Sequence, residues 1–228
     1  MITLICSTYN SSEWIDGYLE SVNNQTLPFF NIHFIDAGST DGSWLKIKNF
    51  EFRVGISVKY TWSPGCSIYE AWNIGYQETN SPYCMNYNTD DKLFPNALST
   101  MLAHAKANPD VDVLYSPCLI TNTKNHTPIV GIHDWAEFSK EALLANCILG
   151  PFPLVKTKTV EEAGWFNPKF TISGDYEMWL RLESKGYTFK KIEEPIGKYF
   201  NNPQGVSSNR ETFQEHVEQD MKIRNMYG

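Results

Sequence analysis

Two adjacent carboxylates, Asp90 and Asp91, follow the run 83–89, which we expect to be a buried strand that ends in a polar loop. Carboxylate oxygens are the ligands that hard divalent cations prefer in proteins. A cation held at the carboxyl end of a strand in an α/β protein can bind a phosphorylated ligand. Because an Asp-Asp pair is also common in solvated turns, the pair by itself leaves both interpretations open.

The chain lacks the common phosphate-binding loops. It has no Gly-x-x-x-x-Gly-Lys sequence and no Gly-x-Gly-x-x-Gly after the first expected strand. P-loop kinases and dinucleotide dehydrogenases hold phosphates with the backbone of such loops, so both classes are disfavoured. A metal-dependent site remains, in which a cation bridges Asp91 and the phosphate oxygens of a diphosphate.

A third carboxylate, Asp175, stands directly after Gly174 at the expected start of a helix. It could take a proton as a general base, or it could cap the helix, and the residues alone leave both roles open. Glu177 competes for the role of base, but two residues further on it lies on a different face of the helix. Arg181 either pairs with a carboxylate or a diphosphate, or is a solvated charge.

Alternating strand and helix patterns position these residues. We expect short apolar strands at 2–7, 30–35, 56–62, 83–89 and 111–115. Between them lie segments whose apolar residues recur at the helical period of 3.6. This order predicts an α/β fold with a doubly wound, mostly parallel sheet flanked by helices. In such a fold the loops at the carboxyl ends of the strands carry function, which places Asp36 and Asp91 at one edge of the sheet.

The second half of the chain is less regular. We expect a β segment near 128–132 and helices at 136–145, 157–163 and 175–185. The tail from Ser208 to Tyr227 places Phe213, Val217 and Met221 at i, i+4 and i+8, which predicts an amphipathic helix. Its charges are of mixed sign, which favours docking of this apolar stripe on the protein over binding to a membrane surface.

Composition excludes several classes of protein. With 42% hydrophobic residues and no apolar stretch near ~18 residues, the chain is neither disordered nor membrane-spanning, and we expect a soluble protein. A net charge of -7 without any Lys/Arg cluster disfavours nucleic acid as a partner. Five cysteines without a Cys-x-x-Cys pair are typical of reduced thiols in a reducing compartment.

Five ordered motifs between residues 2 and 181 resemble one family. They are Ser7-Thr8-Tyr9-Asn10, Ile35-Asp36-Ala37-Gly38-Ser39-Thr40-Asp41-Gly42-Ser43, Gly65 with Tyr69-Glu70-Ala71-Trp72-Asn73-x-Gly75, Asn88-Thr89-Asp90-Asp91, and Gly174-Asp175-Tyr176-Glu177-Met178-Trp179-Leu180-Arg181. Together they resemble the family-2 inverting nucleotide-sugar glycosyltransferases, whose fold is GT-A.

The resemblance implies a role for each of the matched positions Thr8, Asp36, Asp90, Asp91 and Asp175. Thr8 and Asp36 would flank the nucleoside of the donor, and Asp90 would touch the ribose or a metal-bound water. Asp91 would bind Mn²⁺ or Mg²⁺. Asp175 would be the general base that takes the proton of the acceptor hydroxyl.

The chain departs from the family pattern at two positions. Many members carry a second acidic residue where this chain has Ala37, and that side chain often contacts the uracil ring, so UDP is less strongly indicated as the donor nucleotide. A histidine is common at the position of Asn202, which could serve the metal or the diphosphate only through its amide oxygen. Trp72 and Trp179 could form a wall for the sugar, although aromatic residues at helical spacing more often belong to the core.

The expected protein is therefore one glycosyltransferase domain over 1–228, with a nucleotide-sugar half at 1–116 and an acceptor half and C-terminal helix at 117–228. It would be a metal-dependent hexosyltransferase that acts on a glycan or lipid-linked acceptor. We expect it in the cytoplasm, where it could associate peripherally with a membrane. Two alternatives remain open. They are a sugar-nucleotide nucleotidyltransferase and a non-catalytic module that binds nucleotide sugars or glycans.

Overall fold

The computed structural model describes residues 1–206 and 209–228. The elements of the first half are β1 (Ile2–Thr8), α1 (Ile15–Asn23), β2 (Phe30–Asp36), α2 (Ser43–Asn49), β3 (Ile56–Trp62), α3 (Ile68–Gln77), β4 (Tyr83–Asn86), β5 (Lys92–Leu93), α4 (Ala97–Ala107) and β6 (Val113–Tyr115). Those of the second half are β7 (Cys118–Thr121), β8 (Ile129–His133), α5 (Lys140–Ala145), β9 (Leu154–Lys156), α6 (Thr157–Ala163), α7 (Gly174–Ser184), β10 (Phe189–Lys191), β11 (Gly197–Phe200) and α8 (Phe213–Tyr227).

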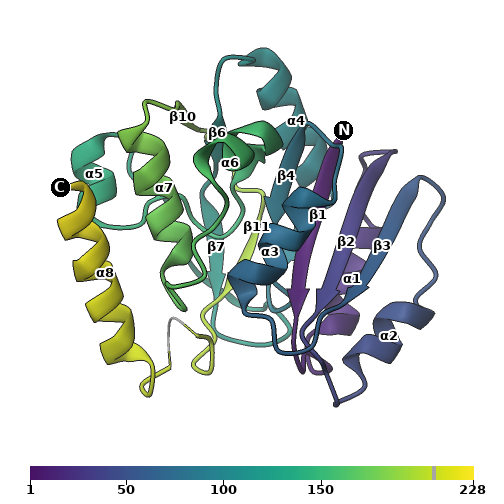
Figure 1. The fold of residues 1–228 in the computed structure, drawn as a ribbon. Helices are drawn as coiled ribbons and strands as arrows, with labels where there is room; N and C mark the ends of the chain where they lie inside the picture. The colour runs from purple at the N-terminus through teal and green to yellow at the C-terminus, as the bar shows by residue number, and fades with distance from the viewer. Residues whose placement is uncertain (207–208) are drawn as a thin grey trace.

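The central sheet has the strand order β10-β6-β9-β4-β1-β2-β3. Every pairing in it is parallel except the two that β9 makes with β4 and β6. β1 is the central strand of the first half, because it pairs with β2 on one side and with β4 on the other. The carboxyl ends of these strands therefore meet at one edge, the lower edge in Figure 1. The predicted doubly wound, mostly parallel α/β sheet is confirmed.

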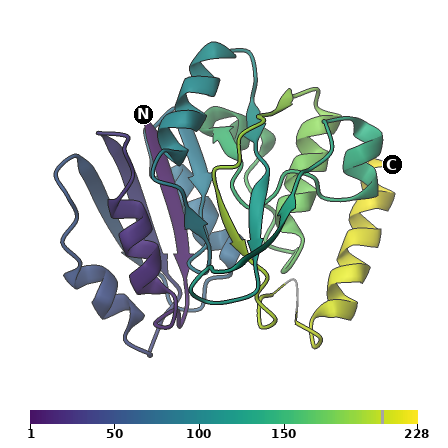
Figure 2. The ribbon, with the colours of Figure 1, turned by 180° about the vertical axis from the view of Figure 1, so that it is seen from behind.

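Helices cover both faces of the sheet. Figure 1 shows α3, α6 and α7 on the near face, and Figure 2 shows α1 and α4 on the opposite face. Each layer of helices buries its own apolar cluster against the sheet, one with Ile15, Leu19 and Leu98, the other with Tyr76 and Trp179. The side chains of β1 alternate between the two clusters, as a strand buried on both faces requires.

A second, smaller sheet has the order β5-β11-β7-β8, and the sequence patterns predict only β8 of these strands. β11 runs antiparallel to β5 and parallel to β7. This pairing brings the chain near residue 200 beside the loop that follows β4. Segments more than a hundred residues apart in the sequence therefore meet at the edge where the main strands end.

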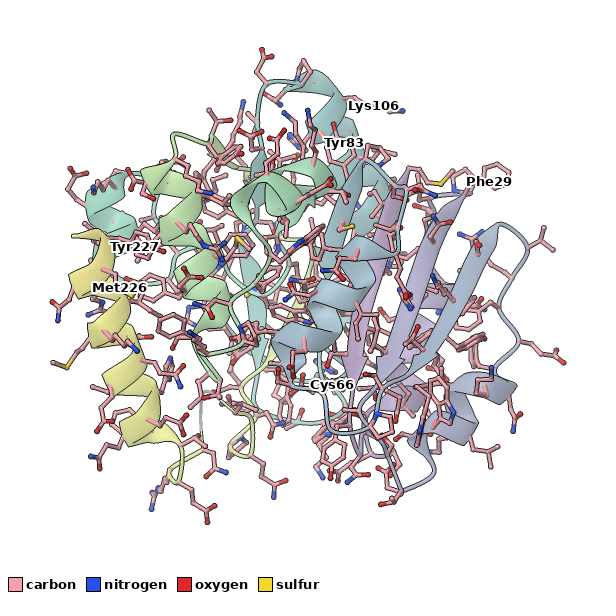
Figure 3. The ribbon with its side chains drawn as sticks, viewed as in Figure 1. Phe29, Cys66, Tyr83, Lys106, Met226 and Tyr227 are labelled. Carbon is pink, nitrogen blue, oxygen red and sulfur yellow. The ribbon has the colours of Figure 1, made fainter. Side chains whose placement is uncertain are left out.

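The ends of the large sheet can be followed in Figure 3. Tyr83, the first residue of β4, lies at the upper edge, whereas Cys66, just before α3, lies at the lower edge with the carboxyl ends of the strands. Met226 and Tyr227 mark the end of α8, at the side of the molecule. None of the helices in the described ranges combines the length and the apolar character needed to cross a membrane.

Several predicted elements are shorter in the structure. The strand expected at 111–115 begins only at Val113. The strand expected at 83–89 ends at Asn86, because β9 pairs with β4 only as far as Met85 and the chain then turns, with Asp91 N donating to Asn88 O. Asp90 and Asp91 therefore lie in a turn, not at a strand end. The helix expected at 136–145 begins only at Lys140, where the Ser139 side chain accepts the N–H of Ala142 and caps it.

The C-terminal helix docks on the protein, but not by the predicted face. Phe213, Val217 and Met221 are 62%, 41% and 57% exposed. The face that packs against α7 instead carries Ile223 and polar residues at the spacing of one helical turn. Because polar side chains supply most of this contact, apolar periodicity pointed to the wrong face. The predicted start at Ser208 lies outside the described residues.

Candidate functional site

One cleft of about 860 Å³ opens at the carboxyl edge of the main sheet. Its walls come from the loops after β1, β2, β3 and β4, from the start of α7 and from the segment after β11. Of the predicted site residues, Asp90, Asp175 and Asn202 line this cleft. The fold thus gathers at one place three side chains that lie up to 112 positions apart in the sequence.

Asp90 and Asn202 contact each other directly. The Asn202 side-chain amide donates a hydrogen bond of 3.0 Å to Oδ2 of Asp90, and its oxygen accepts the backbone N–H of Gln204 at 3.0 Å. The amide oxygen is thus already engaged in the turn that follows. Asn202 holds the β4 loop and the β11 segment together, and its contact with Asp90 is through nitrogen.

Asp91 is enclosed behind the surface of the cleft, with 1% of its area exposed. Its Oδ1 accepts the backbone N–H of Phe200 at 3.0 Å, whereas its Oδ2 is buried with no hydrogen-bond partner among the described residues. Burial and the neighbouring Asp90 carboxylate raise the pKa of Asp91 well above its ordinary value. A buried carboxylate oxygen without a partner is unfavourable unless something else satisfies it.

The residues at this turn fit one end of a metal site. The unpaired Oδ2 of Asp91 and the carboxylate of Asp90 offer the hard oxygen ligands that Mn²⁺ and Mg²⁺ take. Across the described part of the chain, no three His, Cys, Asp or Glu side chains are grouped so that they could hold a metal. Two carboxylates would leave most coordination positions to the ligand and to water, as is usual for Mg²⁺ at phosphates.

Asp175 lies in the first turn of α7 and lines the cleft opposite the β4 loop. The Tyr69 hydroxyl is 3.2 Å from its Oδ1 and 2.5 Å from the carbonyl oxygen of Ile172, so one proton serves two acceptors. Burial raises the pKa of the Asp175 carboxyl above its ordinary value, while the Tyr69 hydrogen bond acts in the opposite direction. Ser173, the residue before α7, forms no side-chain cap. Hydrogen bonds from the backbone N–H groups of Tyr176 and of Asp175 itself also lower the pKa of the Asp175 carboxyl, so a contact with the first turn of α7 accompanies the one with Tyr69.

Glu177 and Arg181 lie on another face of α7 and form a buried structural pair. The Arg181 guanidinium donates to both carboxylate oxygens of Glu177, at 3.0 and 2.9 Å, and the Tyr227 hydroxyl donates to the same carboxylate at 2.7 Å. Arg181 also donates to the carbonyl oxygens of Ala163 and Trp165 after α6. Neither residue of the pair lines the cleft, so the predicted pairing of Arg181 is with a carboxylate of its own helix.

Thr8 and Asp36 lie beneath the cleft and do not line it. Asp36 is fully buried, and its carboxylate accepts the N–H groups of Gly38 and Ser39 and the hydroxyl of Ser39. It therefore builds the loop after β2. The residues of that loop that do line the cleft are Ala37 and Gly38.

The two tryptophans differ in position. Trp179 is 1% exposed and belongs to the core, as the spacing of aromatic residues favoured. Trp72 is also largely buried but lines the cleft, with its ring edge-on to Tyr69 and Phe166 at 5.2 Å. Two aromatic neighbours fix its orientation, so Trp72 presents a rigid apolar surface to whatever occupies the cleft.

The cleft is acidic. Its charged residues in the described part of the chain are Asp90 and Asp175, and neither Lys nor Arg lines it. A diphosphate bound there would meet no protein cation within the lining. This charge balance itself favours a bound divalent cation when the ligand is a phosphate ester.

Sequence reasoning missed part of the site. Thr171 and Ile172 line the cleft just before α7, and Tyr69 hydrogen-bonds to Asp175. Tyr69 stands inside a recognised motif, but nothing in its spacing indicates a partner at position 175. Such contacts depend on how helices α3 and α7 pack, which no local pattern encodes.

A family model described as "Glycosyl transferase family 2" matches residues 3–149. Chondroitin synthase of Pasteurella multocida is 25% identical over 198 residues, which cover 85% of this chain and 20% of that protein. An uncharacterized glycosyltransferase of Haemophilus influenzae is 25% identical over 201 residues, which cover 86% of this chain and 67% of that protein. The chain thus spans about a fifth of the synthase's length and two thirds of the other relative's.

Solved structures have the same fold. The structure of S. aureus TarS 1-349 in complex with UDP-GlcNAc has a TM-score of 0.78 and 16% identity, covering 97% of this chain and 65% of that one. The mannosyltransferase PcManGT from Pyrobaculum calidifontis, in complex with GDP-Man and Mn²⁺, has a TM-score of 0.77 and 16% identity, covering 100% of this chain and 64% of that one. At this identity the likeness concerns the fold, which is GT-A.

Proposed function

Because the chain belongs to glycosyl transferase family 2, we propose that it moves a hexose from a nucleotide-diphosphate sugar to an acceptor hydroxyl with inversion at the anomeric carbon. One observation carries the proposal: Asp175 and Asp90 line the same cleft, together with Trp72 and Ala37. Two carboxylates with different surroundings can take different roles in one reaction, one on the side of the acceptor and the other on the side of the leaving group.

Asp175 is the proposed general base. The acceptor oxygen attacks the anomeric carbon, the bond from that carbon to the diphosphate oxygen breaks, and the hydroxyl proton passes to Asp175. Tyr69 orients the carboxylate through the contact of 3.2 Å. Because burial raises the pKa of Asp175, its carboxylate binds a proton more readily than an exposed carboxylate does.

We further propose that the activity is metal-dependent. Asp91, with its unpaired oxygen, and Asp90 would hold Mn²⁺ or Mg²⁺, and Asn202 would keep Asp90 in place. The bound cation supplies positive charge for a diphosphate leaving group. The absence of Lys and Arg from the described lining of the cleft supports this requirement. The complexes of TarS with UDP-GlcNAc and of PcManGT with GDP-Man and Mn²⁺ make a nucleotide-sugar donor and a metal reasonable for this fold.

The wider setting is also a proposal. We infer that residues 1–228 act as one domain, with donor contacts from 1–116 and acceptor contacts mostly from 117–228. The curated relatives include chondroitin synthase and a teichoic acid poly(glycerol phosphate) polymerase, which supports a glycan or lipid-linked acceptor. All five cysteines are free, which is compatible with the reducing cytoplasm.

A donor screen tests the function. The protein is incubated with UDP-, GDP- and dTDP-sugars, with and without Mn²⁺, and its melting temperature is measured. Release of the nucleoside diphosphate is then measured in the presence of a mixture of glycan acceptors. A ligand at 100 times its dissociation constant should stabilise the native state by about 2.7 kcal/mol. The proposal would be contradicted if no sugar nucleotide stabilised the protein and no nucleoside diphosphate were released from any of them. Stabilisation with transfer intact in Asp175→Asn would instead favour a non-catalytic role for Asp175.

A further inference from the structure

Residues 171–173 form the strap that leads into α7 and sets the position of Asp175. Thr171 and Ile172 line the cleft, and the carbonyl oxygen of Ile172 accepts the Tyr69 hydroxyl that also contacts Asp175. A shift of this strap would therefore move both the proposed base and the group that orients it. No regular element includes the strap, so its position depends on what holds it from outside.

One side chain of the C-terminal helix α8, Gln219, contacts all three residues of the strap. The amide oxygen of Gln219 accepts the backbone N–H groups of Ile172 and Ser173 at 3.0 and 3.1 Å. Its amide nitrogen donates to the Thr171 hydroxyl at 2.6 Å. One glutamine thus contacts three consecutive residues in front of Asp175.

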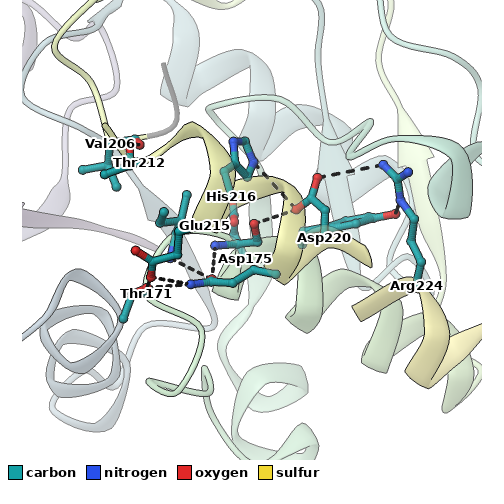
Figure 4. A network of polar contacts seen from close by, with 12 residues as sticks. Thr171, Asp175, Val206, Thr212, Glu215, His216, Asp220 and Arg224 are labelled. Carbon is teal, nitrogen blue, oxygen red and sulfur yellow. Dashed lines mark hydrogen bonds and ion pairs between the residues drawn. The ribbon is translucent and has the colours of Figure 1, made fainter. Parts of the chain in front are cut away.

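Two carboxylates of α8 complete this clamp. Glu215 accepts the Thr171 hydroxyl at 2.5 Å and the Gln219 amide at 2.9 Å, and Asp220 accepts the Ser173 hydroxyl at 2.6 Å (Figure 4). The N–H groups at the start of a helix lack partners within the helix, and α7 has no side-chain cap of its own. The clamp from α8 accepts the N–H groups of Ile172 and Ser173, which directly precede that start.

The clamp is polar where helix packing is usually apolar. Ile223 is the only residue of α8 that is fully buried, whereas Phe213, Val217 and Met221 are largely exposed. Apolar burial is non-directional, but hydrogen bonds fix both distance and angle. The contacts of α8 with the strap are therefore suited to setting a geometry more than to adding stability.

We propose that Gln219 is a positioning residue of the active site, which holds residues 171–173 so that Asp175 faces the acceptor. The inference rests on the proposed transferase function. It gives Gln219 of α8 a role in positioning Asp175, although no residue of α8 lines the cleft. Small displacements of a reacting group cost rate steeply, because the near-attack geometry is narrow.

Gln219→Met tests the proposal, because methionine has similar length but neither accepts from the strap nor donates to it. We expect kcat to fall roughly 10- to 100-fold, the size expected for a misplaced reacting group, with the donor KM nearly unchanged. The matched control is Gln214→Met, since Gln214 is exposed on the same helix and its side chain donates to Glu218, away from the strap. Its kcat should equal that of the wild type.

A rescue variant separates positioning from folding. The exchange Glu215→Gln with Gln219→Glu preserves the charge, keeps an acceptor for Ile172 and Ser173 and keeps an amide beside Thr171, so it should recover most of the lost kcat. Hydrogen exchange of the strap amides measures the clamp without any substrate, and Gln219→Met should accelerate it several-fold. Unchanged exchange, or accelerated exchange with wild-type kcat per folded molecule, would overturn the role of Gln219. An inactive wild-type protein would instead count against the proposed function.

Discussion

Asn202 donates a hydrogen bond of 3.0 Å to Oδ2 of Asp90, across 112 positions of the sequence. The contact joins the turn after β4 to the segment after β11. A second, buried contact joins the same turn to the end of β11, because Phe200 N donates to Oδ1 of Asp91. The acidic turn is thus held on both of its carboxylates by the second sheet. A rigid pair of carboxylates is a better cation site than a mobile one, since less ordering accompanies binding.

Donor binding should depend on a metal at this turn. We expect a nucleoside diphosphate to bind at least about tenfold more weakly in EDTA than in Mn²⁺, and Asp91→Asn to cause a similar loss, since even indirect changes at metal sites cost that much affinity. Titration calorimetry measures both. Asp16→Asn is the control, because Asp16 is exposed on α1 and pairs with Lys46. Equal affinities with and without metal would exclude the site.

With Ala37 in the cleft, the protein should discriminate weakly between donors that carry different nucleobases. It lines the cleft where a carboxylate could accept an imide N–H, so the wild-type protein lacks one discriminating contact. We expect UDP to be preferred over GDP and dTDP by less than about 100-fold, the discrimination that a well-formed polar site exceeds. Ala37→Asp should tighten UDP binding roughly tenfold. Competition binding decides, and a strong UDP preference in the wild type would mean that another residue contacts the ring.

Asp175→Asn should lower kcat by about 10² to 10⁴, the usual contribution of a general base, because an amide keeps the shape but cannot take the proton. Donor affinity should be nearly unchanged. Steady-state kinetics with donor titration measures the two quantities. If the substitution lowers the melting temperature and leaves turnover per folded molecule intact, Asp175 is structural.

The pH dependence should carry the signature of the same carboxyl. Burial raises the pKa of Asp175, so the protonated, inactive form persists to higher pH than for an exposed aspartate. We therefore expect kcat/KM to fall as the pH drops through a value above ~3.9, the ordinary pKa of Asp. This acid limb should vanish from the residual activity of Asp175→Asn. A limb that survives the substitution would belong to another group.

Glu177→Gln should weaken folding and leave the chemistry alone. Glu177 is 2% exposed and pairs with Arg181, so its neutralisation leaves a guanidinium without its counter-charge. Breaking a buried pair on one side typically costs roughly 3 kcal/mol. Urea denaturation measures this loss, with the exposed Glu218→Gln as control. A drop in kcat per folded molecule as large as that of Asp175→Asn would transfer the role of base to Glu177.

The alternation of strands and helices determined the first half of the fold from sequence alone. Buried strands such as β1 and β2 are short segments rich in apolar residues, and the helices between the strands repeat apolar residues at the helical period, so each pattern is local and readable. Asp90 and Asp175 could be selected the same way, since each follows a recognisable element boundary within a motif.

Other features were decided by tertiary structure. The second sheet consists of strands of two to five residues that pair across long separations, too short to show a period. Asp36 and Asp90 look alike in the sequence, yet one carboxylate is consumed by its own loop and the other lines the cleft. Which of them reaches a ligand depends on local hydrogen bonds that form only in the folded chain.

The C-terminal helix α8 shows most clearly what sequence patterns alone could not predict. Its sequence marks Phe213, Val217 and Met221 as the face to be buried, because apolar periodicity is the signal that a single helix carries. In the folded protein Gln219 and Asp220 face inward instead, because they accept hydrogen bonds from the N–H and hydroxyl groups of residues 171–173. The composition of a helix determines that it forms, whereas the polar groups of a distant strap determine which way it faces.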